Sequence, residues 1–373
     1  MSLLHSLGFL LTIQKFHTIP NFSIDSKISF IIIVLRVIPI CILILVGLFH
    51  PIILSILFPN YVSRHSVLIS VANFVGVSEF LIHYMALSLI FALGIKYNRL
   101  HVGLLIDIIS FEKKLKEQLK DFKTNYCFVK IIFIFEILII LFFNYGFSVS
   151  LFVAYGGRLT LYDIISHLVH TTTTMLNDSF ILYICHILWE LKKITFLLRN
   201  YLKKSQIKDN FTIINGFLKL IRHVNRALGP LIIITYLQHI ISCSLGMYYI
   251  FWFSFNIIRA GFSIHFIFGS IFWAARDIFY LTFLSSLGNY LENQTDELLN
   301  WQNREEFPDT SKNKRENEYF CKHRLWIRHL ERGVIASGSR KINNSGMFSI
   351  ITFVINFMVI LIQFQNMEDM RVK

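Results

Sequence analysis

Charged residues are scarce in this chain. Only 16% of its 373 residues are Asp, Glu, Lys or Arg, whereas soluble domains carry about 25%. The chain also has only 6 prolines and 17 glycines, which excludes collagen-like and low-complexity proteins. Hydrophobic residues make up 54% of the sequence, and the mean hydropathy is +0.57. This combination indicates an integral membrane protein.

Cysteine is scarce as well, and its placement excludes two further classes. The five cysteines are Cys41, Cys127, Cys185, Cys243 and Cys321. They form no Cys-x-x-Cys pair and none lies in a segment that we expect outside the cell, so no disulfide framework, zinc motif or redox motif is predicted. His167 and His170 have the spacing of a helical metal pair, but two ligands do not make a metal site. We therefore predict no metal and no cofactor.

Long apolar segments are abundant. Seven of them approach or exceed the length that crosses a bilayer, which is about 20 helical residues. They cover approximately residues 28–49, 66–95, 128–153, 163–188, 228–255, 257–287 and 346–364. The sequence therefore predicts an all-α membrane protein with seven transmembrane helices.

The basic residues predict the orientation. Most of them lie in three alternate gaps between the apolar segments, within residues 96–130, 192–226 and 304–341. The other three gaps hold one basic residue each: Arg64, Arg158 and Arg259. By the positive-inside rule the basic gaps face the cytoplasm, which places the N-terminus inside and the C-terminus outside. Because this topology explains the net charge of +13 and no soluble basic module is present, we predict no nucleic-acid binding.

The basic gaps are not simple linkers. Leu104, Ile108 and Leu115 recur at helical spacing with lysines between them, which predicts amphipathic helices that continue the spans into the cytoplasm. The expected organisation is a cytoplasmic N-terminal segment (1–27), a six-helix transmembrane domain with cytoplasmic extensions (28–287), a cytoplasmic anchor region (288–345), a seventh helix (346–364) and a short extracellular tail (365–373).

The last apolar segment ends in Gln363-Phe364. A glutamine amide in lipid is costly unless it meets protein, water or the interface. The segment reads Asn356-Phe357, five hydrophobic residues, then Gln363-Phe364. It follows Ala336-Ser337-Gly338, Ile342-Asn343 and Phe348-Ser349-Ile350-Ile351.

Over these residues the chain resembles the insect gustatory receptors, which end in Thr-Tyr, five hydrophobic residues and Gln-Phe. The departures are Asn356 in place of Thr and Phe357 in place of Tyr. Seven spans and the inverted topology also fit this family, which belongs to the insect chemoreceptor superfamily. G-protein-coupled receptors, by contrast, have the opposite orientation.

The resemblance implies a tastant-gated, nonselective cation channel in the plasma membrane, expected in sensory neuron dendrites. It implies a homo- or hetero-tetramer with related receptor subunits, embedded in membrane lipid. The seventh helix would line a central pore, with Gln363, Phe364, Ile360 and Phe357 as pore and gate residues, because a phenyl ring can close a pore by dewetting and an amide can replace ion hydration. From the residues alone, an interfacial Gln363 and an aromatic-belt Phe364 remain the alternative.

The resemblance also implies an outward-open pocket among helices two to six that binds a small-molecule tastant. Tyr and Trp suit sugar or alkaloid faces, and Glu and His suit polar or cationic ligands. The ligand-binding candidates are Glu79, Tyr145, His167, Tyr248, Tyr249, Trp252 and His265. We also expect Arg276 to pair with Glu136 or Asp178, because an isolated buried charge is costly.

Three alternatives stay open. One is an odorant receptor subunit of the same superfamily. Another is a multi-span enzyme, which would need paired carboxylates or a His/Asp set at one membrane face; the acidic residues Asp107, Glu112 and Glu117 are instead interleaved with lysines as on a solvated helix. The third is a transporter, which would show inverted repeats and broken helices. The sequence favours a receptor channel and not an enzyme.

Overall fold

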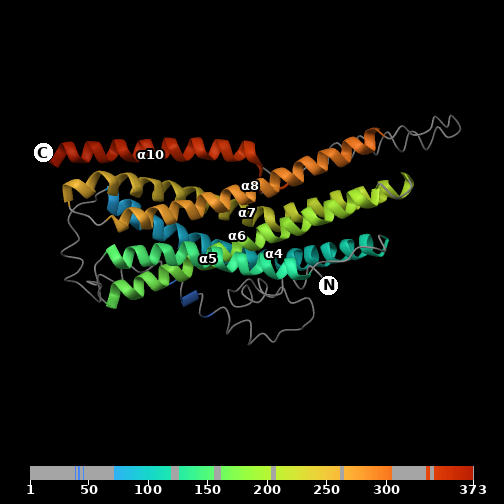
Figure 1. Ribbon diagram of the computed structural model, residues 1–373, viewed down its shortest axis with the longest axis horizontal. Coiled ribbons are helices and arrows are strands. Elements are labelled where there is room, and N and C mark those ends of the chain that lie inside the picture. The colour runs from blue at the N-terminus through green and yellow to red at the C-terminus, as the bar shows by residue number, and fades with distance from the viewer. Residues whose placement is uncertain are drawn as a thin grey trace.

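Six long helices form most of the described part of the protein (Figure 1). The structure is a computed structural model, and it describes residues 38, 41–42, 45, 71–118, 126–154, 161–202, 207–260, 264–304, 333–336 and 340–372. The helices are α4 (Val71–Gln118), α5 (Tyr126–Ala154), α6 (Leu161–Leu202), α7 (Ile207–Ala260), α8 (His265–Arg304) and α10 (Asn344–Val372). The predicted all-α membrane fold is confirmed.

Four of these helices contain segments that are long and apolar enough to cross a membrane. The segments are Leu81–Glu117, Thr212–Phe255, His265–Leu298 and Asn344–Met367, and a shorter apolar segment covers Leu138–Ser150 in α5. The first expected span, residues 28–49, lies almost entirely outside the described residues. The count of seven spans, the orientation and the domain boundaries therefore stay predictions.

The helices are much longer than a membrane is thick. At 1.5 Å per residue, the 54 residues of α7 extend about 80 Å, whereas the hydrocarbon core measures about 30 Å. The helices run side by side along the long axis of the molecule (Figure 1). The prediction that the spans continue as helices is confirmed at α4 and α6, which are unbroken through their basic segments.

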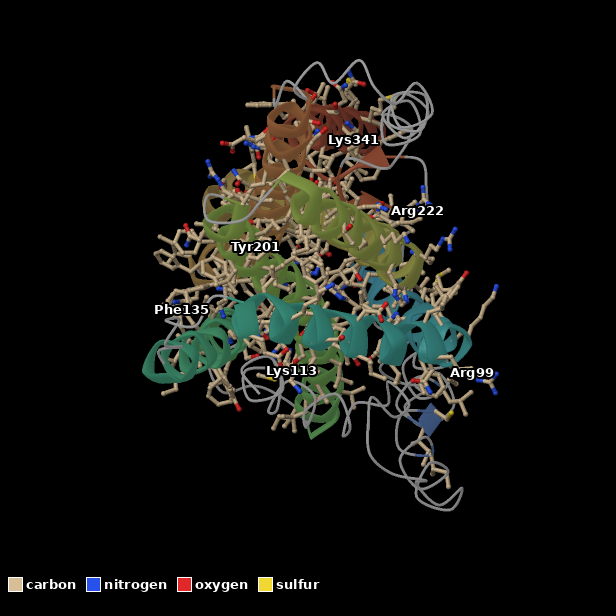
Figure 2. The ribbon with its side chains drawn as sticks, turned by 90° about the vertical axis from the view of Figure 1, so that its right-hand side faces the viewer. Arg99, Lys113, Phe135, Tyr201, Arg222 and Lys341 are labelled. Carbon is tan, nitrogen blue, oxygen red and sulfur yellow. The ribbon has the colours of Figure 1, made fainter. Side chains whose placement is uncertain are left out.

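The core follows from the helical spacing of the apolar residues. Leu104, Ile108 and Leu115 of α4 are buried, as their spacing predicts, and they belong to one continuous cluster with residues of α6, α7 and α8. α7 and α8 are the central helices, because α7 packs against α4, α6, α8 and α10, and α8 packs against α5, α6, α7 and α10. On the periphery, Phe135 of α5 points away from the bundle and is 60% exposed (Figure 2), as expected for a side chain that faces lipid.

A compact joint connects α8 to the start of α10. The strands β1 (Ile335–Ala336) and β2 (Arg340–Lys341) form a short antiparallel hairpin. Asn343 then caps α10, since its Oδ1 accepts a hydrogen bond from the Gly346 amide at 2.9 Å. The Asn343 Nδ2 donates to Glu292 of α8 at 2.8 Å. At Gly288 of α8, any Cβ would overlap the carbonyl oxygen of Ile342, so the close approach requires glycine there.

Two helix ends differ from the approximate ends of the apolar segments. The sixth span was expected to begin at Ile257, but α7 continues to Ala260 and α8 begins at His265. Residues 257–260 are thus the last turn of α7, because hydropathy does not mark a helix boundary inside a nearly continuous apolar run. The seventh helix begins at Asn344 and continues to Val372, so the residues expected as a tail extend this helix beyond Phe364.

Candidate functional site

A buried polar network occupies the space between α4, α6, α7 and α8. Its first part is a carboxylate with two histidines: His170 Nε2 donates to Glu79 Oε1 at 3.0 Å, and His83 Nε2 lies 4.0 Å from the same oxygen. The rings of His83 and His170 meet edge to face at 5.4 Å. All three side chains are less than 9% exposed, so Glu79 is held among partners and away from lipid.

The second part of the network joins α4 to α7 and α8. Gln238 Nε2 donates to His83 Nδ1 at 2.9 Å. The hydroxyl oxygen of Ser242 lies 3.5 Å from His83 Nε2 and accepts hydrogen bonds from Trp273 Nε1 at 2.6 Å and from the Arg276 guanidinium at 3.2 Å. Ser242 therefore connects the histidine cluster to a buried ionic centre.

The ionic centre consists of Arg276 with two carboxylates. Arg276 Nε donates to Asp277 Oδ1 at 3.1 Å, and it lies 4.0 Å from Asp178 Oδ1. His239 Nδ1 donates to Asp277 at 2.8 Å, and Asn144 donates to Asp178 at 2.7 Å. These partners offset part of the cost of burying the charges in an apolar bundle.

An aromatic cluster lies next to this network, and we define it as Phe147, His167, Tyr248, Tyr249, Trp252 and Trp273. The Trp273 ring packs on Phe147 and Tyr249 at centroid distances of 5.9 and 5.8 Å. His167 packs on Phe147 at 5.9 Å. The four helices α5, α6, α7 and α8 thus each present an aromatic ring to the cluster.

The aromatic cluster also contacts α10. The hydroxyl of Tyr248, which is fully buried, donates to Gln365 Oε1 at 2.9 Å. Leu361 is buried in the same apolar group, and Phe357 packs against it. The cluster therefore meets α10 on both sides of Gln363-Phe364.

The predicted pore residues lie on two faces of α10. Phe357 faces the bundle and stacks on Phe353 at 6.2 Å. Gln363 is exposed, and Ile360 and Phe364 are 47% and 52% exposed. α10 packs against α7, α8 and α4 on one side, and most of its described side chains on the other side are exposed.

The predicted ligand residues divide into two groups. Glu79 lies in the polar network, and His167, Tyr248, Tyr249 and Trp252 lie in the aromatic cluster. Two candidates fall outside both groups. Tyr145 is 57% exposed on the outer side of α5, and His265 lies half-buried at the start of α8, with its ring 6.2 Å from Phe268.

For the predicted ion pair, the structure places Arg276 between Asp178 and its own neighbour Asp277. The side chain of Glu136 is outside the described side chains. Among the described residues, no group of three or more His, Cys, Asp or Glu side chains could hold a metal ion.

Sequence reasoning missed several members of the site, namely His83, Gln238, His239, Ser242 and Trp273. A helical signal marks some of them: His83 lies one turn after Glu79, and Ser242 lies one turn after His239. Trp273 gave no such signal, because a tryptophan in an apolar helix is most often a packing residue.

Comparison with known proteins gives a structural match only. No protein-family model and no curated protein matches the chain. The chain is similar in structure to the insect olfactory receptor OR5 from Machilis hrabei in complex with eugenol, with a TM-score of 0.59 and 11% identity over 97% of this chain and 100% of that one. Another structure of the same receptor gives a TM-score of 0.60 and 10% identity over 96% of both chains. The chain therefore has the fold of an insect olfactory receptor.

Proposed function

We propose that the chain is a gustatory receptor subunit of the insect chemoreceptor superfamily, which opens a nonselective cation channel when a small-molecule tastant binds. The fold supports the superfamily, and the Gln363-Phe364 ending with its spacing supports the gustatory type. The same fold would suit an odorant receptor, but the Gln363-Phe364 ending argues against that type.

The observation that carries the proposal is the hydrogen bond from Tyr248 to Gln365. It links the aromatic cluster directly to α10, at the residue that follows the predicted gate Gln363-Phe364. A ligand that displaces Tyr248 would therefore act on α10 without an intermediate element. A receptor channel needs such a contact, because a ligand shifts a gating equilibrium only through different contacts in its two states.

The exposed surface of α10 supports assembly around a pore. Phe348, Phe353, Ile355 and Val359 are between 43% and 71% exposed. In a tetramer, α10 helices from four subunits would meet around a central axis, with some of these side chains packed between subunits. Gln363 would then supply amide groups to the pore, and Phe364 would form a hydrophobic constriction.

The composition of the site supports a ligand with both flat apolar faces and polar groups. Tyr249, Trp252 and Trp273 offer aromatic faces, which suit sugar rings and alkaloids. The buried Nε2 of His167 has no hydrogen-bond partner among the described residues, so it is available to a ligand. Glu79 and His170 form a polar pair close to this cluster.

The test is expression of the full chain in cells, with current recording during application of a panel of sugars, alkaloids and volatile odorants. We expect a cation current evoked by a nonvolatile tastant, and Tyr249→Ala should weaken it. Tyr145→Ala is the matched control, because this tyrosine is exposed on the outside of the bundle. Robust surface expression without current from any compound, in homomers and after co-expression with related receptors, would argue against a channel. A response confined to volatile compounds would favour the odorant alternative.

A further inference from the structure

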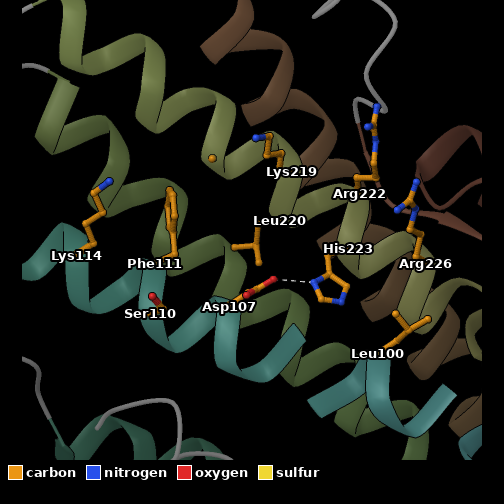
Figure 3. A pocket seen from close by; sticks show the side chains of 11 residues that line it. Leu100, Asp107, Ser110, Phe111, Lys114, Lys219, Leu220, Arg222, His223 and Arg226 are labelled. Atoms are coloured by element: carbon orange, nitrogen blue, oxygen red, sulfur yellow. Dashed lines mark hydrogen bonds and ion pairs between the residues drawn. The ribbon is translucent and has the colours of Figure 1, made fainter. Parts of the chain in front are cut away.

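A basic groove lies between α4 and α7 (Figure 3). On α7 its residues come several helical turns before Tyr248 and Tyr249 of the aromatic cluster. It has a volume of about 550 Å³, which is within the range of small-ligand sites, about 300 to 1,000 Å³. On the predicted orientation it opens toward the cytoplasm. The positive-inside rule accounts for these basic residues only as a topology signal.

Four cationic side chains line this groove: Lys114 from α4, and Lys219, Arg222 and Arg226 from α7. The three α7 residues are spaced three and four apart, which places them along one face of the helix. Arg222 is half-buried, whereas the other three are exposed. Two helices thus present positive charge to one concave surface.

Among the described residues that line the groove, Asp107 is the one acidic side chain, and it already has a partner. Asp107 accepts a hydrogen bond from His223 Nδ1 at 2.8 Å (Figure 3). Within the described part of the chain, no carboxylate lies within 4.0 Å of any of the four groove cations.

Other lysines of the same helix segment are different. Lys113 pairs with Glu117 at 3.7 Å and Lys116 pairs with Glu112 at 2.6 Å, both outside this groove. If the basic residues served only to orient the helices, carboxylates could neutralise them inside the groove as they do outside it. The groove instead keeps an excess of positive charge.

The remaining lining is apolar. Leu100, Phe111 and Leu220 lie in the groove between the cations, so a ring or a short carbon chain can contact the floor while anionic groups meet the rim. Guanidinium groups bind phosphate oxygens through two parallel hydrogen bonds, and lysines add point charges. Several separated cations fit an anion that carries more than one phosphate.

From this geometry we infer that the groove binds a multiply phosphorylated ring of the inositol phosphate class, either free or as the headgroup of a membrane lipid. A bound inositol phosphate would contact both α4 and α7 and so hold the two helices together across the groove. Because α7 packs against α10, the site is placed where an anionic lipid or metabolite could adjust the receptor.

The test uses the full chain in phosphatidylcholine nanodiscs. Binding of soluble inositol 1,4,5-trisphosphate is measured by calorimetry, and retention of phosphatidylinositol 4,5-bisphosphate added to the nanodiscs is measured by native mass spectrometry. The groove variants are Lys114→Gln/Lys219→Gln and Arg222→Gln/Arg226→Gln. The matched control is Lys96→Gln/Lys113→Gln, which removes the same charge from α4 outside the groove.

Wild type and control should bind at least one probe, and each groove variant should bind about 30-fold more weakly, since two basic side chains are lost from the phosphate contacts. If the soluble inositol 1,4,5-trisphosphate binds, a free inositol phosphate is sufficient to occupy the groove. If only the lipid is retained, the ligand is a lipid headgroup in the bilayer. Arg222→Lys keeps the charge and should lose only part of the affinity. The inference is overturned if neither probe binds wild type, or if groove and control variants lose affinity equally while their unfolding temperatures match that of wild type.

Discussion

The hydrogen bond between Tyr248 and Gln365 gives the most specific prediction about gating. Tyr248→Phe removes only the hydroxyl that donates to Gln365 at 2.9 Å, and the ring keeps its place among Leu245, Trp273 and Leu361. A hydrogen bond of this kind contributes about 1 kcal/mol. That energy corresponds to about a fivefold change in an equilibrium constant.

We expect Tyr248→Phe to raise the ligand concentration for half-maximal current by about fivefold or more, because displacement of the aromatic cluster no longer pulls on α10. The increase is larger if the four subunits of the proposed tetramer open together. The assay is the ligand concentration dependence of whole-cell current, normalised to surface expression. Tyr145→Phe is the control, since this tyrosine is 57% exposed and should respond like wild type.

A double-mutant cycle separates coupling from general damage. Gln365→Leu should shift the curve in the same direction as Tyr248→Phe, and the double variant should shift it little further, with an interaction energy of about 1 kcal/mol. Strictly additive shifts, or a Tyr248→Phe response equal to that of Tyr145→Phe, would refute the reasoning.

Three further predictions concern stability and the gate. Gly288→Ala should reduce the unfolding temperature and surface expression, because its Cβ overlaps the Ile342 carbonyl. Gly103→Ala should be tolerated, because its Cβ meets only the His223 side chain at 3.3 Å. Equal effects of the two variants would contradict the joint between α8 and α10. Asp277→Asn should lower the free energy of unfolding by about 3 kcal/mol, since it leaves Arg276 without its nearest carboxylate. The control Glu117→Gln, on the surface, should change the free energy of unfolding by less than about 1 kcal/mol. Both variants are measured by thermal unfolding in nanodiscs. Phe364→Ala should increase the current in the absence of ligand. Phe348 is exposed near the start of the same helix, and Phe348→Ala should leave that current unchanged. An unchanged resting current in Phe364→Ala would show that the Phe364 ring is not part of the gate.

The helices could be predicted from the sequence because burial in a helical bundle repeats with the helix turn. The spacing of Leu104, Ile108 and Leu115 follows that period, and all three are buried. The boundary between α7 and α8 could not be predicted in the same way. Apolar residues such as Ile257, Ile258 and Phe262 stand before and after the end of α7, so mean hydropathy does not mark where that helix stops.

The composition of the site shows a second limit. Asn144 and Tyr145 are adjacent, yet Asn144 is 3% exposed and bonded to Asp178, while Tyr145 is 57% exposed. A signal for this difference exists: Ser148 follows Asn144 by one turn and lies 3.2 Å from the hydroxyl of Thr171, so a polar stripe marks the inner face of α5. The contacts of Trp273 with Ser242 and Phe147 depend on how four helices pack, and no local pattern in the chain encodes that.

We propose that α10 lines a ligand-gated pore with its gate at Gln363-Phe364. The most direct measurement is current through Phe364→Cys channels while a charged thiol reagent is applied from outside during ligand stimulation. We expect a rapid, irreversible change of the ligand-evoked current in Phe364→Cys, and no change in wild type or in Phe348→Cys. A ligand-evoked current in Phe364→Cys that is untouched by the reagent, although the thiol is labelled at the cell surface, would contradict it.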